Sequence, residues 1–239
     1  MQEYVNPTGY HEMPAPRRAG LVCSWTAALP PAATPFVQRV VPDGCVDLIW
    51  SDAEILVAGP DTGPIPAAMR PGDSVVAVRF APGAAPPVLG VPADAVRDAR
   101  LSLRELWGAD AERLAAEVVA AEPDARHTAL VAGVMARAAG AAPADPLVPA
   151  VVSGLARSSV RAVSDDLGLG ERQLRRRSLA AFGYGPKTLQ RVLRFQRALR
   201  LARAGEPLAD VAYAAGYADQ AHLSHEVRDL AGEPLGALL

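Results

Sequence analysis

The sequence predicts an α+β protein, in which a mostly-β barrel or sandwich with following helices precedes an all-α C-terminal region. Three observations support this fold class. In the first hundred residues, short β-branched runs alternate with Pro and Gly. From Leu101 onward, apolar residues recur at helical spacing. Beyond residue 147 nearly every segment is helical, and Gly or Pro stands at each break.

The first half contains five predicted strands. The run from Val75 to Phe80 is too apolar for a strand with one face in water. We therefore expect part of the sheet to be covered on both faces. The predicted strands are Leu21 to Thr26, Phe36 to Val41, Val46 to Ser51, Ile55 to Ala58 and Ser74 to Phe80.

A linker is predicted between the two halves. Two helices of moderate length are expected between Leu101 and Met135, with a break at Pro123. The stretch from Gly140 to Pro146 holds two prolines and small residues, which do not continue a helix. A chain of 239 residues exceeds the usual domain size of ~100–200 residues. We expect an N-terminal domain of residues 1–140 and a C-terminal domain of residues 147–239.

Six helices are predicted in the C-terminal domain. Glycines stand where left-handed C-terminal caps are needed, at Gly168, Gly183, Gly205 and Gly216. Pro186 and Pro207 stand where first-turn positions are expected. The predicted helices are Leu147 to Leu155, Val160 to Leu167, Glu171 to Phe182, Pro186 to Ala204, Leu208 to Ala215 and Gln220 to Ala231.

Charge is distributed unevenly along the chain. Residues 1–152 carry 11 basic and 17 acidic side chains, whereas residues 153–239 carry 13 basic and 9 acidic ones. Between Glu171 and Arg203 there are ten basic residues and one acidic residue. Such a density neutralises several phosphates and makes binding strongly salt-dependent. The C-terminal domain is therefore expected to face a polyanion, and double-stranded DNA is the expected partner.

The segment from Val211 to Ser224 has the pattern of a helix-turn-helix. Ala212 is small because the two helices cross there, and Gly216 takes the turn conformation that a side chain hinders. Asp219 is placed to cap the second helix. That helix is expected to present four residues outward, namely Gln220, Ala221, Ser224 and His225.

A first unit of the same kind precedes it. Its helices are Val160 to Leu167 and Glu171 to Arg177, with a core of Leu167, Leu169 and Leu174. The helix from Pro186 to Ala204 joins the units and spans ~28 Å at ~1.5 Å per residue. A rod of this length suits two recognition helices entering successive major grooves, which lie ~34 Å apart. Contacts to the DNA backbone are expected from Arg177, Lys187, Arg191 and Arg194, and along the same helix from Arg197 and Arg200.

These residues resemble the AraC family of bacterial transcription regulators over about eighty positions. The resemblance rests on LRRR from Leu174, GYGPK from Gly183, RFQRA from Arg194, VAYAAGYADQAHLS from Val211 and GEP from Gly232. It implies a seven-helix domain with two helix-turn-helix units and sequence-specific DNA binding. It places base-reading residues at Arg172, Arg175 and Arg176 in the first unit, and at Gln220, Ala221, Ser224 and His225 in the second.

Three positions depart from the family pattern. Gly170 replaces the usual Ser or Thr cap, while Ser178 and Val227 stand where Phe is common. A Gly cap costs only a few tenths of a kcal/mol, but a lost buried aromatic costs several unless Leu179 or Phe182 fills the space. We expect the first unit to be the less stable one.

The N-terminal half, with PDGCVDL from Pro42 and VRFAPG from Val78, looks like an uncharacterised sensor-like domain. In the wider family such a domain binds a small effector or mediates dimerisation. The candidate effector residues are Trp25, Arg39, Asp43, Asp47, Trp50 and Arg79. Turn capping and a structural ion pair explain the charged members equally well, and core packing explains the two tryptophans.

The competing class is an enzyme or a thiol or metal sensor built on Cys45 or Cys23. No His is recognisably paired with either thiol, so we expect no catalytic residue, no metal ligand and no cofactor. Two cysteines in a reducing cytosol are also expected to form no structural disulfide. No run approaches the ~18 apolar residues of a membrane helix, and the start of the chain, with Glu3, Asn6 and His11, lacks a signal pattern. We expect a cytoplasmic monomer or homodimer without membrane contact, and RNA polymerase and a small-molecule effector as further partners.

Overall fold

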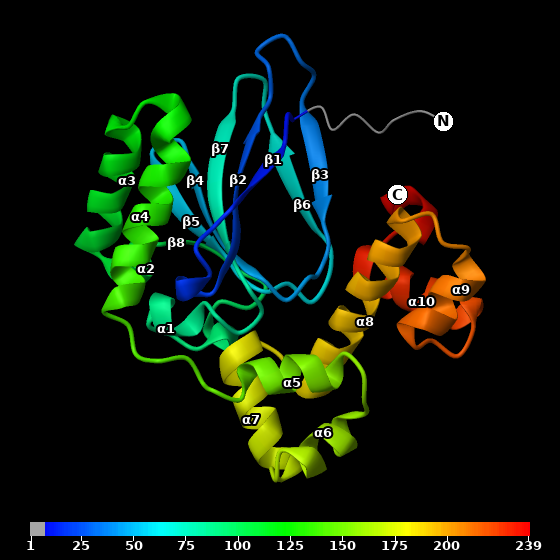
Figure 1. The fold of residues 1–239 in the computed structure, drawn as a ribbon. Coiled ribbons are helices and arrows are strands. Elements are labelled where there is room, and N and C mark those ends of the chain that lie inside the picture. Colours follow the sequence, from blue (N-terminus) through cyan, green and yellow to red (C-terminus); the bar gives the residue numbers. More distant parts are fainter. Residues whose placement is uncertain (1–7) are drawn as a thin grey trace.

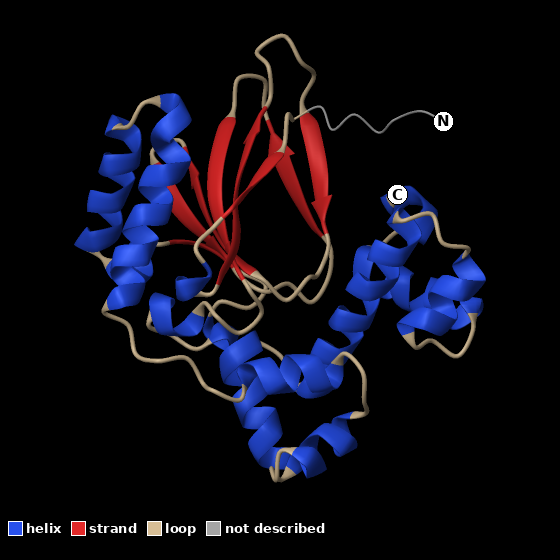
Figure 2. Ribbon diagram, viewed as in Figure 1, coloured by secondary structure: helices blue, strands red, loops and turns tan. Residues whose placement is uncertain are grey.

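The computed structural model describes residues 8–239, and it is an α+β protein as predicted (Figures 1 and 2). A β-rich half is followed by two groups of helices joined by one long helix. Glu3 and Asn6, on which the expectation of a missing signal pattern partly rested, lie outside the described residues. No helix in the described part of the chain is long and apolar enough to cross a membrane.

Two antiparallel sheets form the N-terminal half. The larger has the order β1-β2-β7-β4-β5-β8, and the smaller pairs β3 with β6. Three short strands, β1, β6 and β8, escape sequence analysis because they are polar, contain Pro or span only three residues. The strands are β1 His11–Pro14, β2 Leu21–Ala28, β3 Phe36–Val40, β4 Val46–Ser51, β5 Glu54–Ala58, β6 Ile65–Met69, β7 Ser74–Phe80 and β8 Arg100–Ser102.

Strand β7 lies between β2 and β4 near the middle of the larger sheet. Val76, Val78 and Phe80 point toward the helices and are at most 3% exposed. Ala77, on the opposite face, is also fully buried. The expectation that this strand is covered on both faces is therefore confirmed. Helices α3 and α4 lie on one side of the sheet, and β3 and β6 lie on the other (Figure 1).

Short helices and turns surround the sheet before the chain leaves it. The break at Pro123 separates α3 from α4, as predicted. Residues 140–147 then connect α4 to the C-terminal helices. The elements are η1 Arg17–Ala19, α1 Pro86–Leu89, η2 Ala93–Ala95, α2 Arg104–Trp107, α3 Ala109–Ala120, η3 Pro123–Ala125 and α4 Arg126–Ala139.

The C-terminal helices agree with the predicted ones to within a residue at each end. Gly183 and Gly216 have φ of 80° and 86°, the left-handed conformation that a helix end requires there. The helices are α5 Val148–Leu155, α6 Val160–Asp166, α7 Glu171–Phe182, α8 Pro186–Arg203, α9 Leu208–Ala215 and α10 Gln220–Ala231, followed by η4 Leu235–Leu238.

The turn between α7 and α8 packs against the N-terminal half. A Cβ on Gly183 would lie 2.7 Å from Pro60 Cγ and 3.1 Å from the carbonyl oxygen of Ala93, so only glycine fits there. Arg97 donates a hydrogen bond of 2.9 Å to the Gly183 carbonyl. Farther along, Arg39 of β3 forms an ion pair of 2.8 Å with Glu233. The two halves therefore meet through specific polar contacts at several points.

Candidate nucleic-acid interface

The second helix-turn-helix unit consists of α9 and α10. Ala212 is 1% exposed at the place where the helices pack, and Gly216 makes the turn. The Asp219 carboxylate accepts a hydrogen bond of 2.7 Å from the His222 backbone amide, so it caps α10 as predicted. Gln220, Ala221 and His225 are exposed at the start of α10. Ser224 is half-buried, and its hydroxyl donates to the Gln220 carbonyl.

The first unit consists of α6 and α7. Ser159 caps α6 by accepting from the Ala162 amide, whereas α7 begins at Gly170 without a side-chain cap. Leu174 is fully buried, while Leu167 and Leu169 pack against the same core. The candidate base readers Arg172, Arg175 and Arg176 are exposed on α7 and have no ion pair within residues 8–239.

Helix α8 belongs to the cores of both units. Leu189 and Val192 pack with α5, α6 and α7. Phe195 and Leu199 pack with α9 and α10. Its 18 residues span about 27 Å at ~1.5 Å per residue. One helix thus fixes the positions of two recognition helices relative to each other (Figure 1).

Arg191 and Arg194 of α8 are held inside the domain. Arg194 lies 2.6 Å and Arg191 3.2 Å from carboxylate oxygens of Glu226, which is buried on α10. The Arg194 guanidinium also lies over the Tyr217 ring, 4.5 Å from its centroid. A buried carboxylate needs such partners because an unpaired charge is costly to bury. Arg191 and Arg194 therefore hold α10 to α8, and their expected contact with the DNA backbone stays a prediction.

Arg177 is likewise engaged, with its guanidinium 2.6 Å from Asp145 in the segment before α5. Burial raises the pKa of Asp145, but hydrogen bonds from the Leu147 amide and from Arg177 outweigh it and lower that pKa below its ordinary value. The expected contact of Arg177 with the DNA backbone likewise stays a prediction. Lys187, Arg197 and Arg200 are exposed on α8.

A hollow of about 690 Å³ lies beside the first recognition helix. One wall is α7, with the three exposed arginines Arg172, Arg175 and Arg176. The other wall comes from the N-terminal half. It consists of Pro92, which precedes η2, and Asp94, which lies in η2. Sequence analysis gave no indication of this second wall, because it is eighty residues away in the chain.

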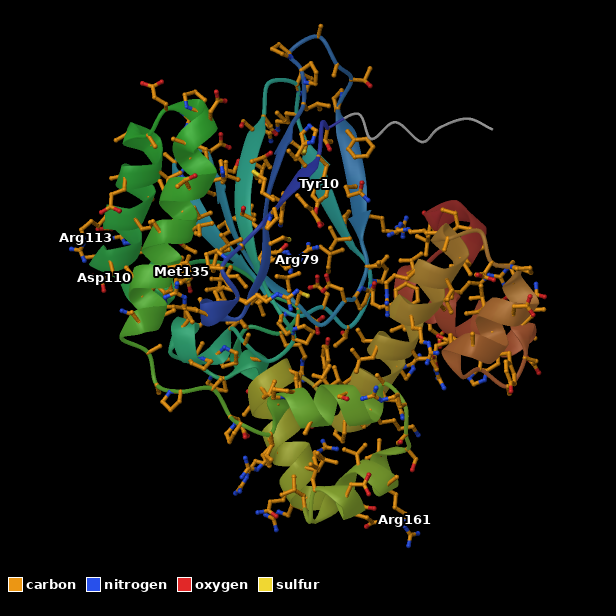
Figure 3. All side chains as sticks on the ribbon, in the orientation of Figure 1. Tyr10, Arg79, Asp110, Arg113, Met135 and Arg161 are labelled. Carbon is orange, nitrogen blue, oxygen red and sulfur yellow. The ribbon has the colours of Figure 1, made fainter. Side chains whose placement is uncertain are left out.

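The N-terminal half contains a polar cluster on the face of the large sheet toward β3 and β6 (Figure 3). Arg79 makes two hydrogen bonds, of 2.9 and 2.8 Å, to Asp47. The Trp25 indole donates to the same carboxylate, at 3.2 Å. Asp43 lies 3.9 Å from Arg79 and accepts from the Cys45 amide. Burial disfavours the charge on Arg79, but Asp47 and Asp43 raise its pKa above the ordinary value.

Two of the six candidate effector residues lie elsewhere. Trp50 belongs to the opposite face of the sheet, in the core beneath α3 and α4, because side chains alternate along a strand. Arg126 stacks over its ring at 5.0 Å. Arg39 is engaged with Glu233 of the C-terminal domain. The fold brings together the other four, Trp25, Asp43, Asp47 and Arg79, and an effector role for any of the six stays a prediction.

Sequence analysis gave no role to two tyrosines, Tyr10, which lies in no motif, and Tyr184, which lies in the GYGPK motif. Tyr10 lies 5.6 Å from Trp25 between ring centroids and so borders the polar cluster. Tyr184, which follows α7, is 2% exposed, and its hydroxyl has no hydrogen-bond partner among the described residues. This hydroxyl lies 3.2 Å from where a Cβ on Gly44 would stand. A residue of the C-terminal domain therefore reaches the Asp43–Cys45 turn.

The two thiols are protonated at neutral pH. Burial raises the pKa of Cys23 to about 11 and raises the pKa of Cys45 well above its ordinary value, with Asp43 adding to the effect at Cys45. A nucleophilic cysteine needs the opposite shift. Residues 8–239 contain no group of three or more His, Cys, Asp or Glu side chains arranged to hold a metal ion.

Each half of the chain matches a known protein family over part of its length. Residues 163–239 match a family described as a helix-turn-helix domain. Residues 13–102 match a domain of unknown function, DUF6597. No curated protein gave a significant match.

Solved structures of ToxT from Vibrio cholerae are similar over most of the chain. The O395 structure has a TM-score of 0.45 and 13% identity, covering 86% of this chain and 96% of that chain. The structure at 1.65 Å resolution gives 0.46 and 14%, covering 86% and 97%. A structure described as unsaturated fatty acid bound wild-type ToxT gives 0.43 and 10%, covering 85% and 90%.

Proposed function

The C-terminal domain of this chain is an AraC-type helix-turn-helix domain, and from this premise we propose that the protein is a sequence-specific DNA-binding transcription regulator. One observation carries the proposal. Two recognition helices, α7 and α10, each with exposed polar side chains, pack against one long helix, α8. Recognition helices read base edges through such side chains.

The proposed reading surface has two parts. In the first unit Arg172, Arg175 and Arg176 read bases, because arginine pairs with guanine through two hydrogen bonds. In the second unit the proposed readers are Gln220, Ala221, Ser224 and His225. The proposed contacts to the DNA backbone are Arg177, Lys187, Arg191 and Arg194, and the exposed Arg197 and Arg200 join them.

The N-terminal domain, residues 1–140, is proposed to control the C-terminal domain, residues 147–239, by binding a small effector. The proposed effector group is Trp25, Asp43, Asp47 and Arg79, in which two carboxylates share one half-buried guanidinium. An effector with a charged or hydrogen-bonding group would redistribute these partners. The Asp43–Cys45 turn would then shift, and this turn adjoins Tyr184 of the C-terminal domain.

The competing reading is a DNA-delivered enzyme or thiol sensor that uses Cys45 or Cys23. The raised pKa of both thiols argues against it. RNA polymerase is proposed as a further partner, with a monomer or homodimer acting in the cytoplasm. These points follow from the proposed regulatory role and fall with it.

Selection from a pool of random duplexes tests the proposal. The full-length protein is mixed with the pool in competitor DNA, and the bound duplexes are sequenced. We expect enrichment of a site with two half-sites about one helical turn apart. Gln220→Ala should relax the preference in one half-site only, and Arg175→Ala in the other. Failure to enrich any sequence over the starting pool would contradict the proposal.

A further inference from the structure

The hollow beside α7 is built from both halves of the chain. Its volume of about 690 Å³ is bounded on one side by the arginines of the first recognition helix. On the other side stand Pro92 and Asp94 of the N-terminal half. Asp94 is exposed, and it forms no ion pair with any residue that the structure describes. Asp94 therefore borders the same open space as Arg172, Arg175 and Arg176.

Contacts close to this hollow hold its two walls together. Arg97, which follows η2, donates its hydrogen bond to the carbonyl of Gly183 at the end of α7. Gly183 also packs directly on Ala93 of η2. Asp94 is the next residue after Ala93. Its position beside α7 is therefore fixed by the docking of the α7 end rather than by a free loop.

We propose that η2 of the N-terminal domain forms part of the DNA-facing surface of the first unit, and that Asp94 lowers its affinity for DNA. This inference rests on the proposed function, because it assumes that Arg172, Arg175 and Arg176 meet DNA. A duplex seated on these arginines brings phosphates into the hollow, where the Asp94 carboxylate repels them. The N-terminal domain thereby limits binding without any contact to bases.

The solvent exposure of Asp94 sets the expected size of its effect on DNA affinity. Asp94 is open to solvent, so its interaction with nearby phosphates is weak and screened by salt, with a Debye length of ~10 Å at 0.1 M. Removing its charge should tighten binding by about 1.4- to fivefold at low salt, as expected for an exposed charge pair worth ~0.2–1 kcal/mol. Replacing it with lysine adds a phosphate contact, which should steepen the dependence of log K on log salt by about one.

Fluorescence anisotropy of the full-length protein on a selected duplex tests the inference. The variants are Asp94→Asn and Asp94→Lys, with Asp124→Asn as the control. Asp124 is exposed in η3, outside the residues that line the hollow, and its replacement changes the net charge equally. Arg175→Ala is measured in parallel to establish that the first unit is engaged.

The inference predicts that Asp94→Asn binds more tightly than wild type, that Asp94→Lys binds more tightly still, and that both gains shrink as salt rises. Asp124→Asn should match wild type. Equal affinities of Asp94→Asn and Asp124→Asn, with Arg175→Ala weakened, would overturn the inference and leave the proposed function intact. Unchanged DNA affinity of Arg175→Ala would overturn both the inference and the proposed function. Failure of the wild-type protein to bind any duplex would do the same.

Discussion

The side-chain amide of Gln196 donates a hydrogen bond of 2.7 Å to the carbonyl of Pro42, which lies 154 residues earlier in the chain. Gln196 lies on α8, the helix that carries both recognition units. Pro42 precedes Asp43, whose carboxylate faces Arg79 in the polar cluster of the N-terminal domain. This bond therefore joins the proposed effector site to the helix that fixes the DNA-reading surface.

Replacing Gln196 with alanine should loosen the Asp43–Cys45 turn. Loss of one hydrogen bond costs about 1 kcal/mol, and the Pro42 carbonyl loses its partner. We expect faster hydrogen exchange of the Cys45 amide, measured by mass spectrometry of the native protein. Gln38→Ala is the matched control, because Gln38 is exposed and bonds only to its neighbour Arg39. Equal exchange in the two variants would refute the proposed link.

Replacing Arg194 with alanine should lower stability, whereas replacing Arg175 should lower DNA affinity. Arg194→Ala leaves the buried Glu226 with Arg191 as its remaining partner, so the free energy of unfolding should fall by roughly 2–3 kcal/mol. Arg175→Ala removes an exposed side chain, so unfolding should change by less than about 0.5 kcal/mol while DNA affinity falls. Urea unfolding and anisotropy distinguish the two. Normal stability of Arg194→Ala with weakened DNA binding would mean that Arg194 acts mainly by contacting the DNA backbone.

Alanine substitution of two buried serines, Ser178 and Ser164, should change the free energy of unfolding in opposite directions. The Ser178 hydroxyl is 1% exposed and has no partner among the described residues, so its removal relieves an unmet hydrogen bond. Ser178→Ala should raise the free energy of unfolding by about 1 kcal/mol. Ser164, whose hydroxyl donates to the Leu169 carbonyl, is the control and should lose about as much. A loss of stability in both variants would mean that Ser178 has a bonded partner in solution.

Sequence analysis predicted the C-terminal helices well because their signals are local. Gly183 and Gly216 end helices, Asp219 begins one, and the apolar residues of α8 recur at helical spacing. The departure at Ser178 was also visible in the sequence. Its consequence, a buried hydroxyl with no partner among the described residues, could be seen only in the packed structure.

The ion-pair partners of the charged side chains could not be predicted from local sequence signals. Glu226 lies 35 and 32 residues from Arg191 and Arg194, and Asp145 lies 32 residues from Arg177. Only the packing of α10 and of the segment before α5 brings these pairs together. Trp50 shows a related limit, because the spacing of a strand says which residues share a face but not which face meets the helices.

Stability should fall at alkaline pH because of the two thiols. Burial raises the folded-state pKa of Cys23 to about 11 and that of Cys45 well above its ordinary value. The unfolded chain then releases thiol protons that the folded chain keeps, so the free energy of unfolding falls as pH rises through about 8.5, by at most ~1.4 kcal/mol per pH unit for each thiol.

Urea unfolding between about pH 8 and 9.5, below the ordinary range of tyrosine, measures this slope. The double variant Cys23→Ala, Cys45→Ala should flatten it. Labelling of the native thiols with a disulfide reagent should also be slower than in the unfolded chain. Faster labelling of Cys45 in the native protein would contradict this account and revive the enzyme or thiol-sensor reading.

The central claim is that the protein reads DNA sequence, and anisotropy on the DNA upstream of its own gene tests it most directly. The purified protein is titrated with that fragment and with a scrambled version of equal length across a salt series. We predict tight binding to the native fragment that survives competitor and weakens on Arg175→Ala. Equal affinity for both fragments at every salt concentration, unchanged by Arg175→Ala, would contradict the claim.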